Sequence, residues 1–367
     1  MRKRAGSNVE VESLEQFDAL VTGGAKHMHG WVLQNLDLTG RSEQLLALDP
    51  SGALLLGCTI DPRVGPYLRL HRALIFPNIP RVPFDPYRSQ LYTPEELYDG
   101  LGEHGYDKTP DAKIYAWSRY RDGDITYPLA RALHDHSIDT ALSEELADKR
   151  AVGVMGGHAL DRDDAGYLEA VRLGRALTLS GHYVATGGGP GAMEAANLGA
   201  YLSDQPADVL EAAIGELSRA PSFHTSIGRW ASVGLDVRRK WPAGQPSLGI
   251  PTWFYGHEPP NPFANKIAKY FQNSLREDTL LRHCTGGIVF LPGAGGTVQE
   301  IFQDTCENYY ADPATIAPMV LVGTEYWGRT VPAWPLLRTL AAGRPMERAV
   351  HLVDSVDEAI DVIAQPC

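Results

Sequence analysis

Residues 286–310 read GGIVFLPGAGGTVQEIFQDTCENYY. An apolar run ends there at a cluster of glycines and a stretch with helical spacing follows, which predicts a strand, a tight turn and a helix. The same succession recurs in HYVATGGGPGAMEAANLGAYL at 182–202 and begins in AVGVMGGHA at 151–159. Strands that alternate with helices predict an α/β fold, a doubly wound, Rossmann-like parallel sheet with helices on both faces. Such sheets bind ligands at the carboxyl ends of their strands, where these glycines lie.

The chain before residue 149 is less regular. A length of 367 residues suggests about two domains, and we predict an accessory α+β segment at 1–148 and a Rossmann-like domain at 149–367. Within the first segment the pattern predicts a short helix at 12–21, a hairpin at 45–60 around an Asp-Pro-Ser-Gly turn, a helix that begins after Thr93 and a mainly helical stretch at 126–149. The sequence shows no internal repeat.

Composition argues against several classes of protein. Lys and Arg number 33 and Asp and Glu number 45, so the formal net charge is −12. This surplus repels nucleic-acid chains and anionic lipid, and we expect neither as a partner. The four cysteines lack CxxC spacing, no apolar stretch reaches the length of a membrane span, and no secretory signal is visible, which favours a cytoplasmic protein. The histidine pairs 27/29 and 134/136 do not share a helix face, and we expect no metal site.

Two glycine turns are candidates for binding an anion. The first, GGGPGAM at 187–193, lacks the GxGxxG dinucleotide spacing, because its glycines are contiguous and Pro190 interrupts them. It is typical either of a tight turn or of a phosphate loop, where bare backbone and a helix N-terminus approach the ligand. The second, PGAGGTVQE at 292–300, contains Thr297 and Glu300, which form either a capping box or part of a functional site. A carboxylate beside an anion-binding turn makes Glu300 a candidate for chemistry near the phosphate.

Arg276 and Glu277 lie between the two turns, early on a predicted helix. Arginine offers a bidentate fork for a phosphate or a ribose hydroxyl. An isolated Arg–Glu pair is also typical of a solvated helix face, so the pattern alone leaves both interpretations open.

Several motifs of the C-terminal part resemble one known family. PGAGGTVQE resembles the PGGxGTxxE signature of the "lonely guy" (LOG) phosphoribohydrolases, long misnamed lysine decarboxylases, and GGGPGAMEAANLGA resembles their first glycine loop. The likeness is closer to the larger bacterial branch, the pyrimidine/purine nucleotide 5′-monophosphate nucleosidases, which carry GGH (here 156–158), GPGAMEA (189–195) and EPPNP (258–262). The match covers about residues 150–325. Ala294 replaces the second glycine of the motif and Gly295 stands at its variable position, and neither departure removes a chemical group.

The resemblance implies an enzyme of purine and pyrimidine nucleotide metabolism that hydrolyses the N-glycosidic bond of nucleoside 5′-monophosphates to free base and ribose 5-phosphate. It implies no metal or cofactor, and a homo-oligomer, either dimer or tetramer. Catalytic roles fall on Glu300, as a stabiliser of the oxocarbenium-like state or as a base for water, and on Arg276. Substrate contacts fall on Gly156, Gly157, His158, Gly188, Gly189, Gly191, Met193, Glu277, Gly293, Ala294, Gly295, Gly296 and Thr297. The N–H groups of the last three are expected to hold the phosphate.

Two other functions stay open at this point. One is a cytokinin-activating phosphoribohydrolase restricted to N6-substituted adenine nucleotides. The other is a non-catalytic nucleotide or cofactor carrier on the same fold, such as the molybdenum-cofactor carriers, although the presence of Glu300 argues against it. No lysine lies in a context that suggests a pyridoxal-phosphate Schiff base, so we do not expect lysine decarboxylation.

Overall fold

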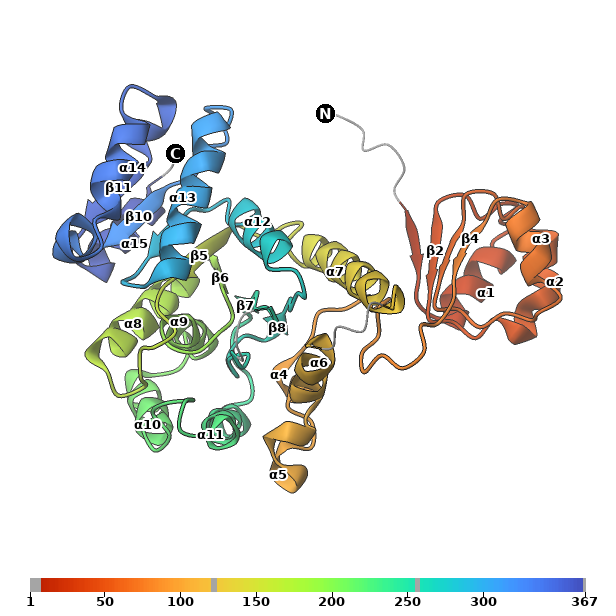
Figure 1. Ribbon diagram of the computed structural model, residues 1–367, viewed down its shortest axis with the longest axis horizontal. Coiled ribbons are helices and arrows are strands. Elements are labelled where there is room, and N and C mark those ends of the chain that lie inside the picture. The colour runs from red at the N-terminus through yellow and green to blue at the C-terminus, as the bar shows by residue number, and fades with distance from the viewer. Residues whose placement is uncertain (1–7, 120–123, 255–257, 366–367) are drawn as a thin grey trace. The chain divides into compact units, whose positions relative to one another are not determined.

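The computed structural model describes residues 8–119, 124–254 and 258–365 (Figure 1). Contacts divide the chain into an N-terminal unit, residues 1–90 with 121–140, and a C-terminal unit, residues 91–120 with 141–367. This division differs from the predicted boundary at 148, because residues 91–120 and 141–148 pack with the C-terminal unit. Helix α7 (Thr126–Glu145) lies in the stretch expected to be helical.

The N-terminal unit is a succession of parallel strands. Among its described residues the sheet has the order β1-β2-β3-β4, formed by Val9–Val11, Trp31–Gln34, Leu54–Leu56 and Leu74–Phe76. Between them lie α1 (Leu14–Thr22), η1 (Thr39–Arg41), α2 (Ser42–Ala47) and α3 (Gly65–Leu70). The helix expected at 12–21 is confirmed as α1, which begins with a capping box between Ser13 and Gln16.

Two expectations for this unit were wrong. The stretch 45–60 is not a hairpin, because its first residues belong to α2 and β3 pairs in parallel with β2 and β4. An internal repeat is also present: Glu10 pairs with Val32, Val32 with Leu54 and Leu54 with Leu74, so the strand–helix unit recurs after 22, 22 and 20 residues. The repeat lies in the placement of buried apolar residues such as Leu33 and Leu55, whereas other paired positions, such as Gln34 and Leu56, carry different residues.

The C-terminal unit confirms the predicted Rossmann-like fold. Its described residues form a parallel sheet in the order β11-β10-β9-β5-β6-β7-β8. The strands are β5 (Ala151–Met155), β6 (Tyr183–Thr186), β7 (Leu248–Gly249), β8 (Lys266–Ile267), β9 (Ile288–Phe290), β10 (Met319–Val322) and β11 (Val350–Val353). β5 pairs with both β6 and β9, so the direction of winding reverses between β5 and β9. A ligand crevice is expected at such a switch point.

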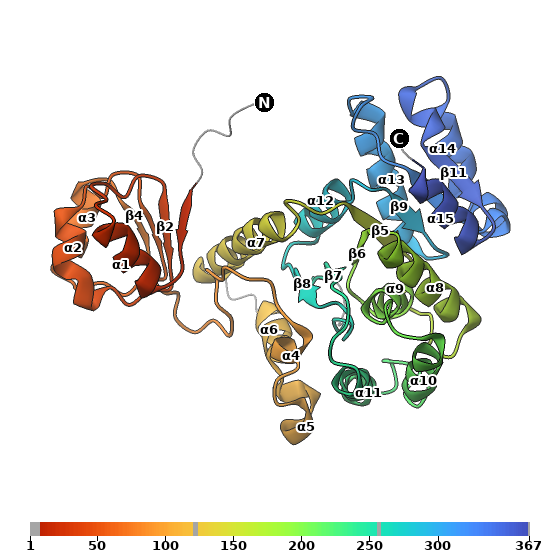
Figure 2. The ribbon, with the colours of Figure 1, turned by 180° about the vertical axis from the view of Figure 1, so that it is seen from behind.

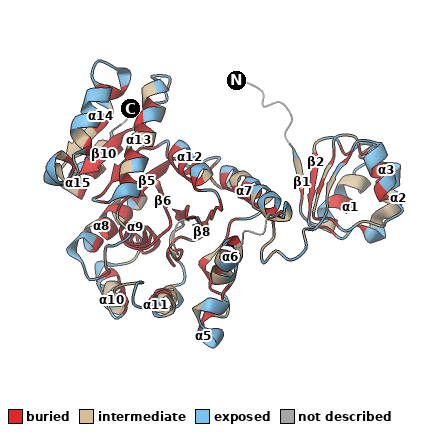
Figure 3. Cartoon of the chain, viewed as in Figure 1, coloured by how far each residue is buried: buried red, intermediate tan, exposed pale blue. Residues whose placement is uncertain are grey.

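Helices cover both faces of this sheet (Figure 1, Figure 2). On one face α8 (Ala165–Leu179), α9 (Ala192–Tyr201) and α15 (Val356–Ala364) bury an apolar core with alternate strand residues such as Val152 and Val154. On the other face α12 (Asn273–His283), α13 (Gly295–Tyr310) and α14 (Ala333–Ala341) pack side by side. The inner strands of the sheet, β5, β6, β7, β9 and β10, are buried along their whole length, whereas the edge strands β11 and β8 are partly exposed (Figure 3).

Eight further elements complete the described part of the C-terminal unit. Two of them, α10 (Ala207–Leu217) and α11 (Ile227–Lys240), are full-length helices. The short ones are α4 (Pro94–Leu97), α5 (Leu101–His104), η2 (Tyr106–Lys108), α6 (Pro110–Ser118), η3 (Tyr326–Thr330) and η4 (Pro345–Arg348). The helix expected after Thr93 is confirmed as α4, where the Thr93 hydroxyl accepts the Glu96 N–H at 3.2 Å, but it lasts a single turn.

Candidate active site

A cavity of about 380 Å³ lies where β5 and β9 end, and it collects most of the predicted site residues. It is lined by Gly156, Gly157, His158, Met193, Thr252, Glu258, Asn273, Arg276, Glu277, Ala294, Gly295, Gly296, Thr297, Gln299 and Glu300. The two candidate catalytic residues are therefore brought together at one edge of the sheet. Gly188, Gly189, Gly191 and Gly293 are not in this lining.

The second glycine turn faces the cavity with open backbone. Helix α13 begins at Gly295, and its N-cap Ala294 makes no capping hydrogen bond through a side chain. Thr297 and Glu300 lie inside the helix, so the capping-box interpretation is wrong. A Cβ added at Gly295 or Gly296 would meet open space. The N–H groups at this helix start carry partial positive charge and suit an anion.

The first glycine turn has a different task, because residues 187–191 are fully buried. Gly191 has φ +72°, and a Cβ there would collide with the carbonyl oxygen of Gly157. That same carbonyl accepts the N–H of Ala192, the first residue of α9, at 3.1 Å. The turn therefore holds the Gly156–His158 segment against α9, and it shapes the cavity wall without lining it.

Arg276 is held rigidly by backbone oxygens. Its Nε donates to the carbonyl of Ile250 at 2.7 Å and its Nη2 to that of Gly187 at 3.4 Å. Nη1 lies 2.9 Å from Glu277 Oε1 and 3.3 Å from Glu300 Oε1. The arginine is only 8% exposed, so the solvated-face interpretation of the Arg276–Glu277 pair is wrong.

Glu300 is a buried carboxyl that titrates near neutrality. Its exposed fraction is 6%, and burial raises its pKa to about 7; Arg276 opposes this rise and the carboxylate of Glu277 adds to it. A carboxyl with a pKa near the working pH is suited to take and return a proton. In burial, partner and position Glu300 meets the requirements of an acid–base group.

Two buried acceptor atoms near Arg276 have no hydrogen-bond donor among the described residues. Glu277 Oε2 and Asn273 Oδ1 are buried without a hydrogen-bond partner among the described residues, while Asn273 Nδ2 donates to Glu277 Oε1 at 3.2 Å. Buried acceptors of this kind are costly unless a ligand satisfies them. Both residues line the cavity, so they suit ligand hydroxyl groups. Asn273 was missed from the sequence, where nothing distinguishes it from a surface asparagine.

His158 and Glu258 also line the cavity. His158 Nδ1 lies 3.6 Å from Glu258 Oε1. Glu258 begins the EPPNP segment, whose Asn261 donates to the carbonyl of Gly189 at 3.2 Å and so ties this segment to the first glycine turn. The motif was visible in the sequence, yet no role for Glu258 followed from it.

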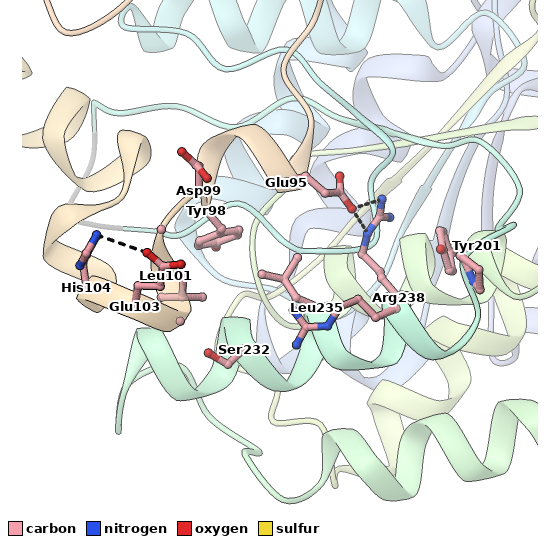
Figure 4. Close-up of a pocket in the computed structure, with 14 residues that line it drawn as sticks. Glu95, Tyr98, Asp99, Leu101, Glu103, His104, Tyr201, Ser232, Leu235 and Arg238 are labelled. Carbon is pink, nitrogen blue, oxygen red and sulfur yellow. Dashed lines mark hydrogen bonds and ion pairs between the residues drawn. The ribbon is translucent and has the colours of Figure 1, made fainter.

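Larger hollows elsewhere hold none of the predicted residues. Figure 4 shows a cavity of about 650 Å³ between the α4–α5 segment and α11, where Arg238 pairs with Glu95 at 2.8 Å. Within the described ranges no group of three or more His, Cys, Asp or Glu side chains is arranged to bind a metal. No helix in the described part of the chain is long and apolar enough to cross a membrane.

Solved structures with a similar course of the chain include cofactor-binding proteins. A molybdenum cofactor binding protein from the phototrophic bacterium Rippkaea orientalis is 16% identical, and the alignment covers 59% of this chain and 95% of that one with a TM-score of 0.36. A molybdenum cofactor carrier protein from Chlamydomonas reinhardtii is 19% identical over 59% and 96%, with a TM-score of 0.35. A structural-genomics target named TM1055 is 20% identical over 59% and 99%, with a TM-score of 0.37. No family model and no curated protein matches the chain.

Proposed function

We propose that the protein hydrolyses the N-glycosidic bond of nucleoside 5′-monophosphates to free base and ribose 5-phosphate. The observation that carries this proposal is the position of Glu300, a buried carboxyl with a pKa of about 7, one helical turn beyond the open N-terminus of α13. An anion-binding helix start and an acid–base group thus share one cavity. A phosphate ester whose reactive carbon lies a few bonds from the phosphate fits this arrangement.

Each part of the nucleotide has a matching group. The phosphate accepts hydrogen bonds from the N–H groups of Gly295, Gly296 and Thr297. The ribose hydroxyls donate to the unpartnered oxygens of Asn273 and Glu277. The base lies toward Gly157 and Met193, on the wall formed by the segment after β5 and the start of α9.

The reaction then needs stabilisation of charge and activation of water. Breaking the C1′–N bond leaves positive charge at the anomeric carbon, which the carboxylate of Glu300 stabilises. The same carboxylate takes a proton from the water that adds to C1′. Arg276, fixed by the carbonyls of Ile250 and Gly187, holds Glu300 in place and keeps part of its population ionised.

A second candidate is binding without turnover, as in a nucleotide or cofactor carrier. The helix start that suits the phosphate is built without Glu300, so a ligand can be held whether or not the bond is broken. The names of the structural neighbours, which include cofactor binding and carrier proteins, agree with this candidate.

Incubation of the purified chain with AMP, GMP, CMP and UMP tests both candidates, with free base and ribose 5-phosphate measured by chromatography. We expect release of base, and a loss of rate on the order of 10² to 10⁴ in Glu300→Gln. Glu307→Gln is the matched control, because Glu307 lies on the same helix outside the cavity lining. Tight binding of nucleotide by the unaltered protein without release of base would support the carrier. Release of base from an N6-substituted AMP, but not from AMP, would identify a cytokinin-restricted enzyme.

A further inference from the structure

A second pair of titratable groups, His158 and Glu258, also lines the cavity. His158 follows β5, and Glu258 lies between β7 and β8. Their side chains are 3.6 Å apart, and they are 47% and 36% exposed, so the pair meets both the cavity and solvent. Nothing in the proposed reaction has yet used this pair.

The backbone on both sides of this pair is anchored. The carbonyl of Gly157, next to His158, accepts the N–H of Ala192 at 3.1 Å. The carbonyl of Glu258 lies 3.4 Å from Lys269 Nζ. Tyr98 donates its hydroxyl to the carbonyl of Pro260 at 2.6 Å. Neither side chain is therefore carried on a loosely held segment.

The Glu258 carboxylate lies over the first glycine turn. A Cβ added at Gly189 would be 3.5 Å from Glu258 Oε2 and 2.9 Å from Met193 Cε. The pair thus lies near Met193, one of the residues assigned above to the base.

The chemistry of the proposed reaction calls for a group at this place. A nucleobase that departs as an anion is a poor leaving group, so cleavage of a glycosidic bond uses an acid that protonates the departing atom and a separate base for water. Glu300 takes the proton of the water and cannot also give one to the base in the same step. A second proton-handling group is required at the base.

We propose that His158, whose Nδ1 lies 3.6 Å from Glu258 Oε1, is the acid that protonates the departing base; this inference rests on the proposed function. The electron pair of the C1′–N bond passes to the base, and a ring nitrogen of the base takes the proton of His158. Water adds its oxygen to C1′ and gives a proton to Glu300. Glu300 then returns its proton to solvent and His158 regains one from solvent, so one water is consumed and both groups are restored.

The test compares two nucleotides that differ in their need for an acid. GMP requires protonation of its base, whereas 7-methylguanosine 5′-monophosphate carries a positive base that departs without a further proton. Nicotinamide mononucleotide serves the same purpose for a pocket that takes only six-membered bases. His158→Gln and Glu258→Gln are expected to lower kcat on nucleotides with ordinary bases on the order of 10² or more, and to leave kcat on the charged-base nucleotides unchanged. Glu300→Gln is expected to lower kcat on both kinds of substrate.

The chain offers a matched control. His104 and Glu103 form another exposed pair with the same 3.6 Å separation, outside this cavity, and His104→Gln is expected to change neither rate. Thermal unfolding and GMP binding verify that the variants fold. Equal losses on both kinds of substrate, or no loss on either, overturn the role of His158 while the proposed function stands. If the unaltered protein releases base from no nucleotide, the proposed function fails and this inference with it.

Discussion

One nitrogen of Arg276 is shared by two carboxylates: Nη1 lies 3.3 Å from Glu300 Oε1 and 2.9 Å from Glu277 Oε1. The other two nitrogens of the guanidinium group donate hydrogen bonds to the carbonyls of Ile250 and Gly187. Burial is the main cause of the high pKa of Glu300; Arg276 opposes this rise, and the carboxylate of Glu277, which shares the same guanidinium nitrogen, adds to it.

Arg276→Gln is expected to slow base release on the order of 10² or more and to move the pH–rate profile. Because the arginine lowers the pKa of Glu300, its loss raises that pKa further, and the limb on which Glu300 must be ionised shifts to higher pH. Rates from pH 5 to 9 measure the shift. Arg282→Gln, at the exposed end of the same helix, is the control. A profile that stays in place would show that Arg276 does not set the ionisation of Glu300.

Stability is expected to fall as pH rises from about 4.5 to about 7 through the contribution of Glu300. Its pKa is raised in the folded state, so the folded protein binds more protons than the unfolded chain in this window. The contribution of Glu300 to the free energy of unfolding is fully present below about pH 4.5 and is lost above about pH 7. It amounts to at most about 3 kcal/mol. Urea unfolding at pH 5 and pH 8 measures it, and Glu300→Gln, which resembles the protonated form, should flatten the slope. The slope should not vanish, because burial also raises the pKa of Asp304.

The two glycine turns show what the sequence can and cannot specify. Both were recognised as strand–turn–helix junctions, since apolar runs, glycines and helical spacing are local signals. Their opposite tasks were not recognised. Gly191 is buried against Gly157 and Gly296 faces open space, and this difference depends on neighbours that are distant in the sequence.

The same limit explains the other differences. Leu45 belongs to a helix although its apolar neighbours suit a strand equally well, so the hairpin at 45–60 failed. Glu258 was quoted within a motif, but no local pattern predicts its contacts with His158 and, through its carbonyl, with Lys269. Glu300 and Arg276 could be predicted as site candidates because their motifs are local, and the structure places them 3.3 Å apart.

Gly296→Ala and Gly191→Ala are expected to separate binding from folding. A methyl group at Gly296 meets no protein atom, so stability should be unchanged, but it stands where the phosphate approaches and should weaken nucleotide binding by about 1 kcal/mol. Gly191→Ala adds a side chain at φ +72° and a collision with Gly157, and should lower the melting temperature. Calorimetric titration with AMP and with adenosine completes the test, because adenosine lacks the phosphate and should bind both Gly296 forms alike. A similar loss of adenosine binding in Gly296→Ala would contradict a phosphate contact there.

Lys269 and Asp111 form a fully buried ion pair 2.8 Å apart, and Trp253 Nε1 also donates to Asp111 at 2.9 Å. Asp111 lies on α6 and Lys269 follows β8, so the pair joins the segment 91–120 to the unit that carries the cavity. Lys269→Met leaves the Asp111 charge buried without this cation, and it should lower the free energy of unfolding by about 3–5 kcal/mol.

Adding Asp111→Leu to Lys269→Met should recover much of that loss, because no unpaired charge then remains. Arg239 and Asp236 form an exposed pair on α11, and the matching changes there should cost less than about 1 kcal/mol. Urea unfolding of the single and double variants measures the coupling between the two residues. If the segment 91–120 unfolded separately from the sheet, Lys269→Met would produce a second unfolding transition. A single transition with a large coupling energy would place this segment in the folding unit of the sheet. The predicted domain boundary at 148 assigned it to the other unit.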